Sequence, residues 1–380
     1  MRCSTSALTF KIVKKFGRCR VSEMALPHGV VRTPVYMPVG TKGAMKAVLP
    51  SSLSDKHMID CDIMLSNTYH LFLKPGEELL SKMGGAHKFM NWDRNLLTDS
   101  GGFQIVSLGS LNTLDEEGVS FQSHIDGKQF KLTPERSMEI QNIIGSDIMM
   151  QLDDVVPPTV DAARVHEAME RSVRWLDRCI AAHKNPETQN LFAIVQGGTD
   201  PELRKKCCDE MIKRNTPGYA IGGMAGGEDK DDFWQTVMQC CELLPEDKPR
   251  YVMGIGYAED CMISALLGAD MFDCVFATRT ARFGTAFTKY GMKKLKKEKY
   301  QTVFTPISEG CTCYTCRNYS IAYVTNLFKK DSSAIQLISI HNIHFLIHML
   351  RDLRTAVLED RGKEFTIDFF KNYFIEEGIP

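Results

Sequence analysis

Residues 191–198 read LFAIVQGG, a run of five apolar side chains that ends at a polar residue and two glycines. Continuous apolar runs of this length are typical of parallel strands that are buried on both faces. Seven further runs end in the same way, and they lie at 33–40, 61–67, 96–102, 147–154, 219–224, 251–256 and 271–276. Helical patterns lie between several of the runs. Eight strands that alternate with helices predict an α/β fold, a (β/α)8 TIM barrel.

The longest helical pattern spans residues 161–184 and begins at Asp161, which is the expected N-cap. Its predicted buried face consists of Val165, Met169, Val173, Leu176 and Ile180. The competing fold is a doubly wound sheet, which usually carries a G-x-G-x-x-G or Walker A phosphate loop. The chain has neither motif, so the barrel is favoured.

Two segments outside this alternation are predicted to be hairpins. Residues 10–24 alternate in polarity around Phe16-Gly17, and residues 119–133 contain Asp126-Gly127, a strong turn signal. The second segment interrupts the third strand-helix unit, so we expect it to be an insertion.

The composition is that of an ordinary globular protein, with 43% hydrophobic and 24% charged residues among 380. The net charge of −1 means that any contact with nucleic acid must come from a local basic patch. Most of the 13 cysteines are scattered, which favours a reducing compartment over a disulfide framework. We find no secretory signal peptide and no window that is long and apolar enough to span a membrane.

Polar residues and glycines follow the predicted strands, and in a barrel these strand ends meet at one mouth. They are Asp99, Ser100, Asp153, Asp154, Gln196, Gly222, Gly223, Gly254 and Asp273. Pairs of carboxylates are the usual means of substitution at a sugar anomeric carbon, one as nucleophile and the other as proton donor or acceptor.

Individual strand-end residues have plainer interpretations as well. Asp273 could cap a helix or pair with Arg279 or Arg282, and the glycines after Asp99 could form a simple turn. Asp153 and Gln196 together could bind the edge of a purine, because a carboxylate accepts hydrogen bonds and an amide both donates and accepts them. The set as a whole favours a binding and catalytic role.

Residues 310–318 read GCTCYTCRN and contain three closely spaced cysteines, Cys311, Cys313 and Cys316. Three thiolates need one further ligand for tetrahedral zinc, and His341, His344 and His348 follow downstream. Spacing does not choose among these histidines. Free thiols and an iron–sulfur site are the alternatives, and a closed structural Zn2+ site, one per chain, is favoured.

The segment 289–300 contains six lysines and one glutamate, and it follows Arg279 and Arg282 closely. Charged runs are usually solvated surface. This run is the strong positive patch of an otherwise neutral chain and lies next to the expected mouth, so phosphate binding is predicted.

The motifs together resemble those of the queuine tRNA-ribosyltransferases, also called tRNA-guanine transglycosylases, and in particular of their eukaryotic catalytic subunits. The resemblance covers nearly the whole chain. It rests on SNTYHL (66–71), LLTDSGGFQ (96–104), QLDD (151–154), VQGG (195–198), IGGMAGGE (221–228), MGIGYAED (253–260), MFDCVFATRTARFG (271–284) and CTCYTC (311–316). Ala277 departs from the proline that is usual in this family after the phenylalanine.

The resemblance implies exchange of guanine for queuine at wobble position 34 of tRNAs with a GUN anticodon (Asp, Asn, His and Tyr). Asp273 would be the nucleophile of a ping-pong reaction and Asp99 the general acid and base. The implied base-binding residues are Asp99, Ser100, Gly101, Gly102, Phe103, Asp153, Gln196, Gly223 and Met253. The implied RNA-binding residues are Gly254, Ile255, Gly256, Tyr257, Ala258, Glu259, Asp260, Thr278, Arg279, Thr280, Ala281 and Arg282. The implied zinc ligands are Cys311, Cys313, Cys316 and His341, the histidine that precedes an asparagine.

The family also implies a domain organisation. We expect a barrel over residues 1–284 with the N-terminal hairpin and an inserted hairpin near 118–132, a zinc-binding subdomain over 285–345, and a C-terminal helical segment over 346–380 that packs on the barrel.

The resemblance further implies a heterodimer with a homologous non-catalytic subunit, no transmembrane segment, and a cytoplasmic location that allows peripheral association with the mitochondrial outer membrane. Two alternatives in other classes are a non-catalytic paralogue, which would lack the two aspartates, and a glycosidase, which would hydrolyse its substrate and need neither zinc nor lysines.

Overall fold

The computed structural model of the chain describes residues 7–102, 112–123, 125, 127–157, 159–224, 226–328 and 332–373. Its centre is an eight-stranded parallel sheet in the order β4-β14-β13-β12-β11-β10-β6-β5, and a parallel bridge between Val39 and Leu65 joins the two end strands. The predicted (β/α)8 barrel is therefore confirmed. Each predicted run overlaps one strand, and four of the strands begin one residue earlier than the run. The strands are β4 (Val35–Pro38), β5 (Ile63–Asn67), β6 (Asn95–Asp99), β10 (Ile148–Met150), β11 (Asn190–Val195), β12 (Gly218–Ile221), β13 (Arg250–Val252) and β14 (Met271–Cys274).

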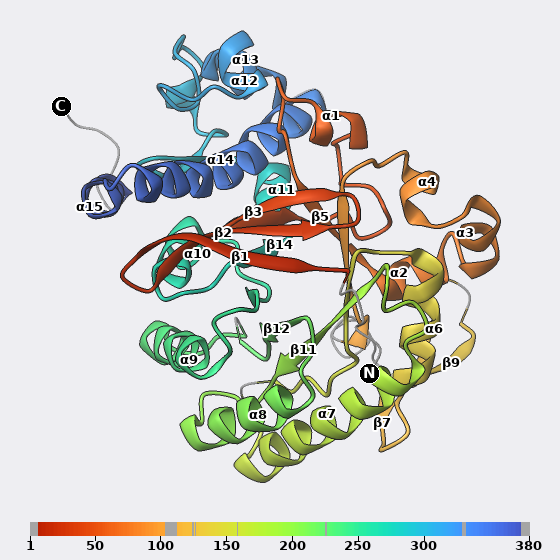
Figure 1. Ribbon diagram of the computed structural model, residues 1–380. Helices are drawn as coiled ribbons and strands as arrows, with labels where there is room; N and C mark the ends of the chain where they lie inside the picture. Colours follow the sequence, from red (N-terminus) through yellow and green to blue (C-terminus); the bar gives the residue numbers. More distant parts are fainter. Residues whose placement is uncertain are drawn as a thin grey trace.

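Helices follow the strands and surround the barrel, as Figure 1 shows for α7 to α10. They are α1 (Pro50–Ser54), α2 (Thr68–Leu73), α3 (Glu77–Met83), α4 (Ala86–Met90), α6 (Pro134–Ile144), α7 (Ala162–Ala182), α8 (Pro201–Lys213), α9 (Lys230–Leu243), α10 (Ala258–Leu266) and α11 (Phe276–Arg282). Asp161 caps α7 as predicted, because its carboxylate accepts a hydrogen bond from the backbone N–H of Arg164. On α7 the prediction for Ile180 is wrong: this side chain is 41% exposed, and Cys179 is buried instead.

The apolar runs are continuous because both faces of each strand are buried. In β11, Leu191, Ala193 and Val195 belong to the core under the helices, whereas Phe192 and Ile194 belong to the core inside the barrel. The same alternation with a period of two occurs in the other long strands. The barrel interior is therefore filled with apolar side chains below its mouth.

The N-terminal hairpin is confirmed and has a third strand that was not predicted. Strands β1 (Thr9–Phe16), β2 (Cys19–Leu26) and β3 (Gly29–Thr33) form an antiparallel sheet. This sheet covers the end of the barrel opposite the mouth. Arg20 of β2 is buried there and donates to Asp270, the residue before β14, with an Nε–Oδ1 distance of 3.0 Å.

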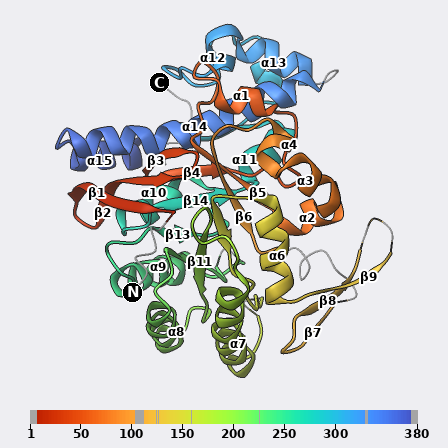
Figure 2. The same cartoon turned by 45° about the vertical axis from the view of Figure 1, so that its right-hand side comes forward.

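The inserted hairpin is also confirmed. Strands β8 (Val119–Gln122) and β9 (Gln129–Leu132) pair with β7 (Asn112–Leu114) in a three-stranded antiparallel sheet that projects from the barrel (Figure 2). Asp126 of the predicted turn lies outside the described residues.

Beyond β14 and α11 the chain forms a small subdomain with its own apolar core. Its elements are β15 (Thr285–Thr288), β16 (Gly291–Lys294), the 3-10 helix η1 (Glu298–Tyr300), α12 (Tyr314–Asn318) and α13 (Ile321–Phe328), followed by the long helix α14 (Ser333–Leu358) and by α15 (Gly362–Tyr373). Helix α14 runs without a break across residues 345 and 346, where we expected a boundary. One rigid helix therefore carries His341 and also packs on the barrel sheet (Figure 1).

Helix α14 is the one helix of the described residues that is long and apolar enough to cross a membrane, so the statement that no such window exists is wrong. Its apolar window is 72% buried inside the protein. The apolar side chains of α14 are therefore explained by packing, as in the core helix of a soluble protein.

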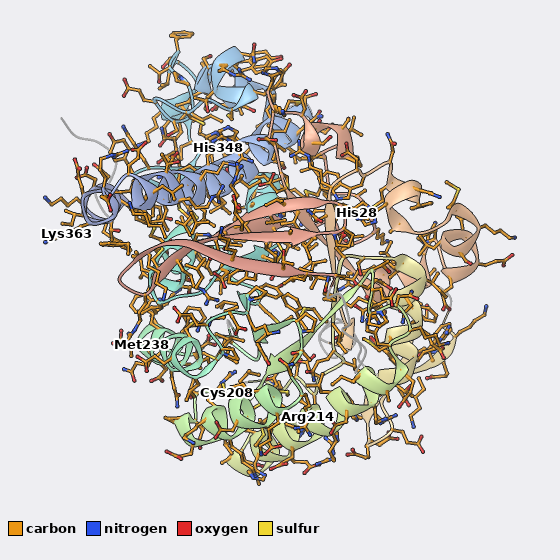
Figure 3. All side chains as sticks on the ribbon, in the orientation of Figure 1. His28, Cys208, Arg214, Met238, His348 and Lys363 are labelled. Atoms are coloured by element: carbon orange, nitrogen blue, oxygen red, sulfur yellow. The ribbon has the colours of Figure 1, made fainter. Side chains whose placement is uncertain are left out.

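The N-terminal sheet is also held to the barrel by a histidine whose pKa is raised by its carboxylate partner. His28, in the turn between β2 and β3 (Figure 3), lies 2.7 Å from the buried carboxylate of Asp147 (Nδ1–Oδ1) and stacks on His87. The hydrogen bond to Asp147 raises the pKa of His28 above its ordinary value of 6.5, and partial burial opposes this shift. The resulting stabilisation is complete below pH 6.5 and is lost as the pH rises through the raised pKa.

We predict that His28→Gln lowers the melting temperature more at pH 5.5 than at pH 8.5. The losses of unfolding free energy at the two pH values should differ by less than about 1 kcal/mol, because the His28 side chain is partly exposed. Thermal unfolding at both pH values measures the effect, with the exposed His57→Gln as control. An equal loss at both pH values would show that the bond between His28 and Asp147 does not couple folding to protonation.

Candidate active site and metal centre

The period of two in the strands decides which side chains enter the barrel mouth. Residues two positions after interior core residues point inward and lie above the apolar layer. Four strand-end residues stand in this position: Asp99 after Leu97, Gln196 after Ile194, Met253 after Tyr251, and Asp273 after Met271. The barrel thus brings together the two aspartates that the sequence suggested.

Asp273 is held by two hydrogen bonds to the same carboxylate oxygen. The Tyr251 hydroxyl donates to Oδ1, and the backbone N–H of Gly254 donates to Oδ1 at 2.8 Å. Burial raises the pKa of Asp273, and these two bonds to the charged form oppose the shift. No hydrogen bond from the described residues reaches the other oxygen, Oδ2, which leaves one oxygen for chemistry.

Asp99 is held by the end of the neighbouring strand β5. Asn67 Nδ2 donates to Asp99 Oδ2 at 2.6 Å, and the backbone N–H of Thr68 donates to Oδ1 at 3.2 Å. Burial raises the pKa of Asp99 to about 7. The bonds from Asn67 and Thr68 lower the pKa, and the nearby charge of Asp273 raises it. A carboxyl group of this kind can both give and take a proton at neutral pH.

Asp153 and Gln196 lie side by side as the sequence predicted, and Gln196 Nε2 donates to Asp153 Oδ2 at 2.6 Å. Burial raises the pKa of Asp153 to about 7, and the bond from Gln196 opposes this shift. Gly223 has φ +68°, and a Cβ there would lie 2.2 Å from Gln196 Oε1. Only glycine therefore lets this turn approach the amide.

The remaining residues that we expected to bind a base have different surroundings. Ser100 is buried, and its hydroxyl accepts the backbone N–H of Gly102 at 3.3 Å. Gly101 has φ +85°, and a Cβ there would lie 2.9 Å from the backbone nitrogen of Tyr69, so this turn also needs glycine. Phe103 lies outside the described residues.

Asp154 does not reach the mouth. Its carboxylate is buried and pairs with two arginines of α7, Arg164 and Arg171. We expected Asp154 at the mouth with the other strand-end carboxylates, because position in the sequence does not distinguish two adjacent aspartates.

The expected RNA-binding residues divide by exposure. Gly254, Tyr257 and Arg279 are exposed, and three others (Glu259, Thr280 and Arg282) are partly exposed. The remaining six are buried, so their side chains do not face solvent in this conformation: Ile255, Gly256, Ala258, Asp260, Thr278 and Ala281. The buried residues pack the loop and helix that present the exposed ones.

Three residues that hold the two aspartates were not assigned a role from sequence. Asn67 and Thr68 lie in the SNTYHL motif at the end of β5, and Tyr251 begins the YVMGIG run. The signal for Tyr251 was available, since a tyrosine at an interior strand position needs a partner for its hydroxyl. The signal for Asn67 was its position at a strand end.

The predicted metal ligands form a compact cluster. The Sγ atoms of Cys311, Cys313 and Cys316 lie 3.8, 3.4 and 3.3 Å from His341 Nδ1. Tetrahedral zinc with bonds of about 2.3 Å to sulfur and 2.0 Å to nitrogen separates such atoms by about 3.6 Å. His341 Nε2 lies 2.6 Å from the backbone carbonyl of Phe287, so Nε2 carries the proton and Nδ1 faces the thiols. The four residues can therefore hold a metal ion.

His344 and His348 lie outside this cluster and stack on each other at 3.7 Å between ring centres. Figure 3 shows His348 on α14 beneath the subdomain. The choice of His341 among the three histidines is thus supported by the fold.

The metal cluster is linked to the barrel through the residue after His341. Asn342 accepts the backbone N–H of Phe287 at 2.9 Å and donates to the carbonyls of Ala277 and Thr285 at 3.0 Å each. Ala277 lies in α11, the helix that carries Arg279. A metal ion at the cluster would therefore stabilise the position of this helix.

Comparisons with known proteins agree with this arrangement. The family model for queuine tRNA-ribosyltransferase matches residues 16–375. The queuine tRNA-ribosyltransferase catalytic subunit of Schizosaccharomyces pombe is 51% identical over 98% of this chain and 94% of its own length. The queuine tRNA-ribosyltransferase of Thermoanaerobacter pseudethanolicus is 48% identical over 98% of this chain and 99% of its own, and the catalytic subunit of Caenorhabditis elegans is 48% identical over 97% and 91%.

We predict that His341→Gln lowers the bound metal from one equivalent per chain to less than about a tenth, because a thiolate site with three ligands no longer closes the tetrahedron. Elemental analysis of the purified protein measures the content. His348 lies about two turns after His341 on α14, and His348→Gln is the control that should keep its metal. Equal metal loss in both variants would refute the assignment of His341.

Proposed function

Because this chain belongs to the queuine tRNA-ribosyltransferase family, which exchanges guanine for queuine in tRNA, we propose that it does so by double displacement with Asp273 as the nucleophile. The observation that carries the proposal is the pair of desolvated aspartates at the barrel mouth, one of which has a pKa of about 7. A nucleophile and a proton donor are the two groups that substitution at an anomeric carbon requires.

In the first step Asp273 Oδ2 attacks C1′ of the ribose. The bond between C1′ and the guanine nitrogen breaks, and its electron pair leaves with the base. Asp99 gives its proton to the departing guanine, so that a neutral base is released. The two hydrogen bonds on Asp273 Oδ1 hold the carboxylate in place during the attack.

The second step reverses these events with queuine. Asp99, now ionised, takes a proton from the incoming base, whose nitrogen attacks C1′ and displaces Asp273. Asp99 thus alternates between its protonated and ionised forms, while Asp273 alternates between a free carboxylate and an ester with the ribose. This is consistent with a pKa near neutrality for Asp99 and with the charge of Asp273 acting on it.

The base is proposed to lie against Asp153, Gln196 and the backbone of Gly223. The carboxylate accepts hydrogen bonds from the N–H groups of the purine edge, and the amide of Gln196 donates to its carbonyl. Met253, which is half-buried at the mouth, would cover one face of the base and Phe103 the other.

The tRNA is proposed to bind across the mouth and the lysine segment 289–300. Five of its lysines are exposed (Lys289, Lys294, Lys296, Lys297 and Lys299), and no carboxylate pairs with them in the part of the chain that the structure describes. Free ammonium groups suit phosphate contacts. Arg279, exposed on α11, extends this surface toward Asp273. The proposed substrates are the tRNAs with a GUN anticodon, modified at position 34.

We also propose Zn2+ as the ion of the cysteine–histidine cluster, in a structural role, because three thiolates and one imidazole form a closed tetrahedral set. Two relatives are catalytic subunits by name, which supports a heterodimer with a homologous non-catalytic partner. From the family resemblance we also propose a cytoplasmic location, with peripheral association at the mitochondrial outer membrane.

The first test traps the covalent intermediate. The purified chain, with and without its partner subunit, is mixed with tRNA that has guanine at position 34, and the products are separated on a denaturing gel. We predict a shifted protein–tRNA band that is absent in Asp273→Asn. Asp99→Asn should form the band about 100- to 10,000-fold more slowly, because the leaving base is no longer protonated.

A band that persists in Asp273→Asn would refute its role as nucleophile. Release of guanine without incorporation of labelled guanine or queuine would instead indicate a hydrolase. A band that needs the partner subunit would support the heterodimer, and full activity of the chain alone would contradict it.

Tyr251 provides a second test of the nucleophile. Removing its hydroxyl in Tyr251→Phe deletes a hydrogen bond that lowers the pKa of Asp273, so less of the carboxylate is ionised at low pH. We predict that the exchange rate falls about 3- to 30-fold at pH 6 and recovers in part at pH 8. Tyr219→Phe, a buried tyrosine that faces the helices, is the control. A loss that does not depend on pH would contradict this role.

A further inference from the structure

Asp154, the acid beside the base-binding Asp153, is the most heavily bonded carboxylate near the mouth. Arg164 donates to its two oxygens at 2.8 and 2.6 Å, and Arg171 donates to Oδ2 at 2.6 Å. Both arginines come from the first half of α7. The carboxylate is fully buried, whereas Arg171 is mostly buried and Arg164 is about one-third exposed.

The backbone between the two acids and α7 is fixed as well. The N–H of Asp154 donates to the hydroxyl of Ser172 at 3.0 Å, and Gln151 Nε2 donates to the Ser172 carbonyl at 2.9 Å. Gln151 also accepts the backbone N–H of Ile194 in the next strand at 2.8 Å. A change at Asp154 or Arg171 therefore acts on Asp153 through charge and through a short, rigid piece of chain.

Arg171 also reaches two further carboxylates, one of them in the inserted sheet region. It bonds Glu116, in the loop between β7 and β8, at 3.3 Å and Glu167 at 3.0 Å. Trp175 Nε1 donates to the carbonyl of Glu116 at 2.9 Å, which seats the same loop on α7. One guanidinium thus connects the inserted sheet to the carboxylate beside the base site.

We propose that Arg171, with Arg164, is a positioning residue that acts through Asp154 and keeps the neighbouring Asp153 in the charged, oriented form that accepts hydrogen bonds from the base. The inference rests on the proposed function, since it concerns the base site of that reaction. In this arrangement the negative charge of Asp154 disfavours an ionised Asp153, and the two guanidinium groups neutralise that charge. The inserted sheet holds Arg171 through Glu116.

The groups that face Asp153 come from every element around it. They are Asp154 in the same loop, Gln196 after β11, Ser100 after β6 and Cys179 on α7. Arg164 and Arg171 bond Asp154 rather than Asp153 and act on Asp153 through it. Burial raises the pKa of the Cys179 thiol to about 12, so it is neutral. The charge of Asp154 raises the pKa of Asp153, after the larger effect of burial. The arginines therefore supply the positive charge that opposes this effect.

The test is the pH dependence of KM for guanine in exchange of labelled guanine into tRNA, measured between pH 5.5 and 8.5. In the wild type KM should rise as the pH falls through about 7, because Asp153 becomes protonated. We call the pH range over which KM rises the limb of this profile. Arg171→Ala should shift the limb to higher pH by about half to one unit, since less positive charge then neutralises Asp154. Asp154→Asn should move it downward, since the repelling charge is gone and the arginines remain.

Arg174→Ala is the matched control. Arg174 bonds the same Glu116 and Glu167 as Arg171 but does not bond Asp154. This variant loosens the contact with the inserted sheet and should leave the limb within about 0.2 pH units of the wild type. Arg171→Lys, which keeps the charge, should lie between Arg171→Ala and the wild type.

Shifts in opposite directions cannot come from general loosening of the fold, which would change kcat and KM alike at every pH. Limbs that do not move, or that move in the same direction in Arg171→Ala and Asp154→Asn, would overturn the inference. If Asp154→Asn does not fold, Arg171→Ala and Arg171→Lys against Arg174→Ala decide the question. A wild type that incorporates no guanine would refute the proposed function itself, which is a different outcome from an active enzyme with unmoved limbs.

Discussion

Burial of both faces of the barrel strands is the constraint on which the rest of the structure depends. A strand alternates its side chains with a period of two, so one set fills the barrel and the other packs under the helices. The interior set of β11 is Phe192 and Ile194, and the next interior position is Gln196. A polar residue at that position cannot lie in the apolar layer and must stand at the mouth. The active site is therefore built one step above the interior core.

This position has an electrostatic consequence. The aspartates at the mouth rest on an apolar layer and lose much of their hydration, which raises their pKa values. Local donors then differentiate them: Tyr251 and Gly254 stabilise the charged form of Asp273, and Asn67 and Thr68 orient Asp99. The proposed division of labour between a nucleophile and a proton carrier rests on these partners, because the two side chains are chemically identical.

Elements outside the barrel support the mouth from two sides. On one side, α14 connects the metal cluster to α11 through Asn342, so that the helix carrying Arg279 is fixed to the subdomain. On the other, α7 connects the inserted sheet to the loop of Asp153 and Asp154 through Arg171. Both additions to the basic fold thus end at residues next to the site, which explains why a barrel that is already complete carries them.

The sequence by itself determined the barrel, both hairpins, the two central aspartates, the pair of Asp153 and Gln196, and the three cysteines that could hold a metal ion. These features follow from local periodicity and from short spacings, which act along the chain. Spacing left the choice among three histidines open, and His341 followed from the family resemblance before the fold placed it at the cysteines. Tertiary structure alone decided which of two adjacent aspartates is buried against α7, and which of the twelve expected RNA-binding residues are exposed. It also decided that Tyr251 and Asn67 hold Asp273 and Asp99. Such contacts join residues of different strands, as Asn67 and Asp99 do. The energy of a hydrogen bond or ion pair depends on distance and burial in space, neither of which local sequence specifies.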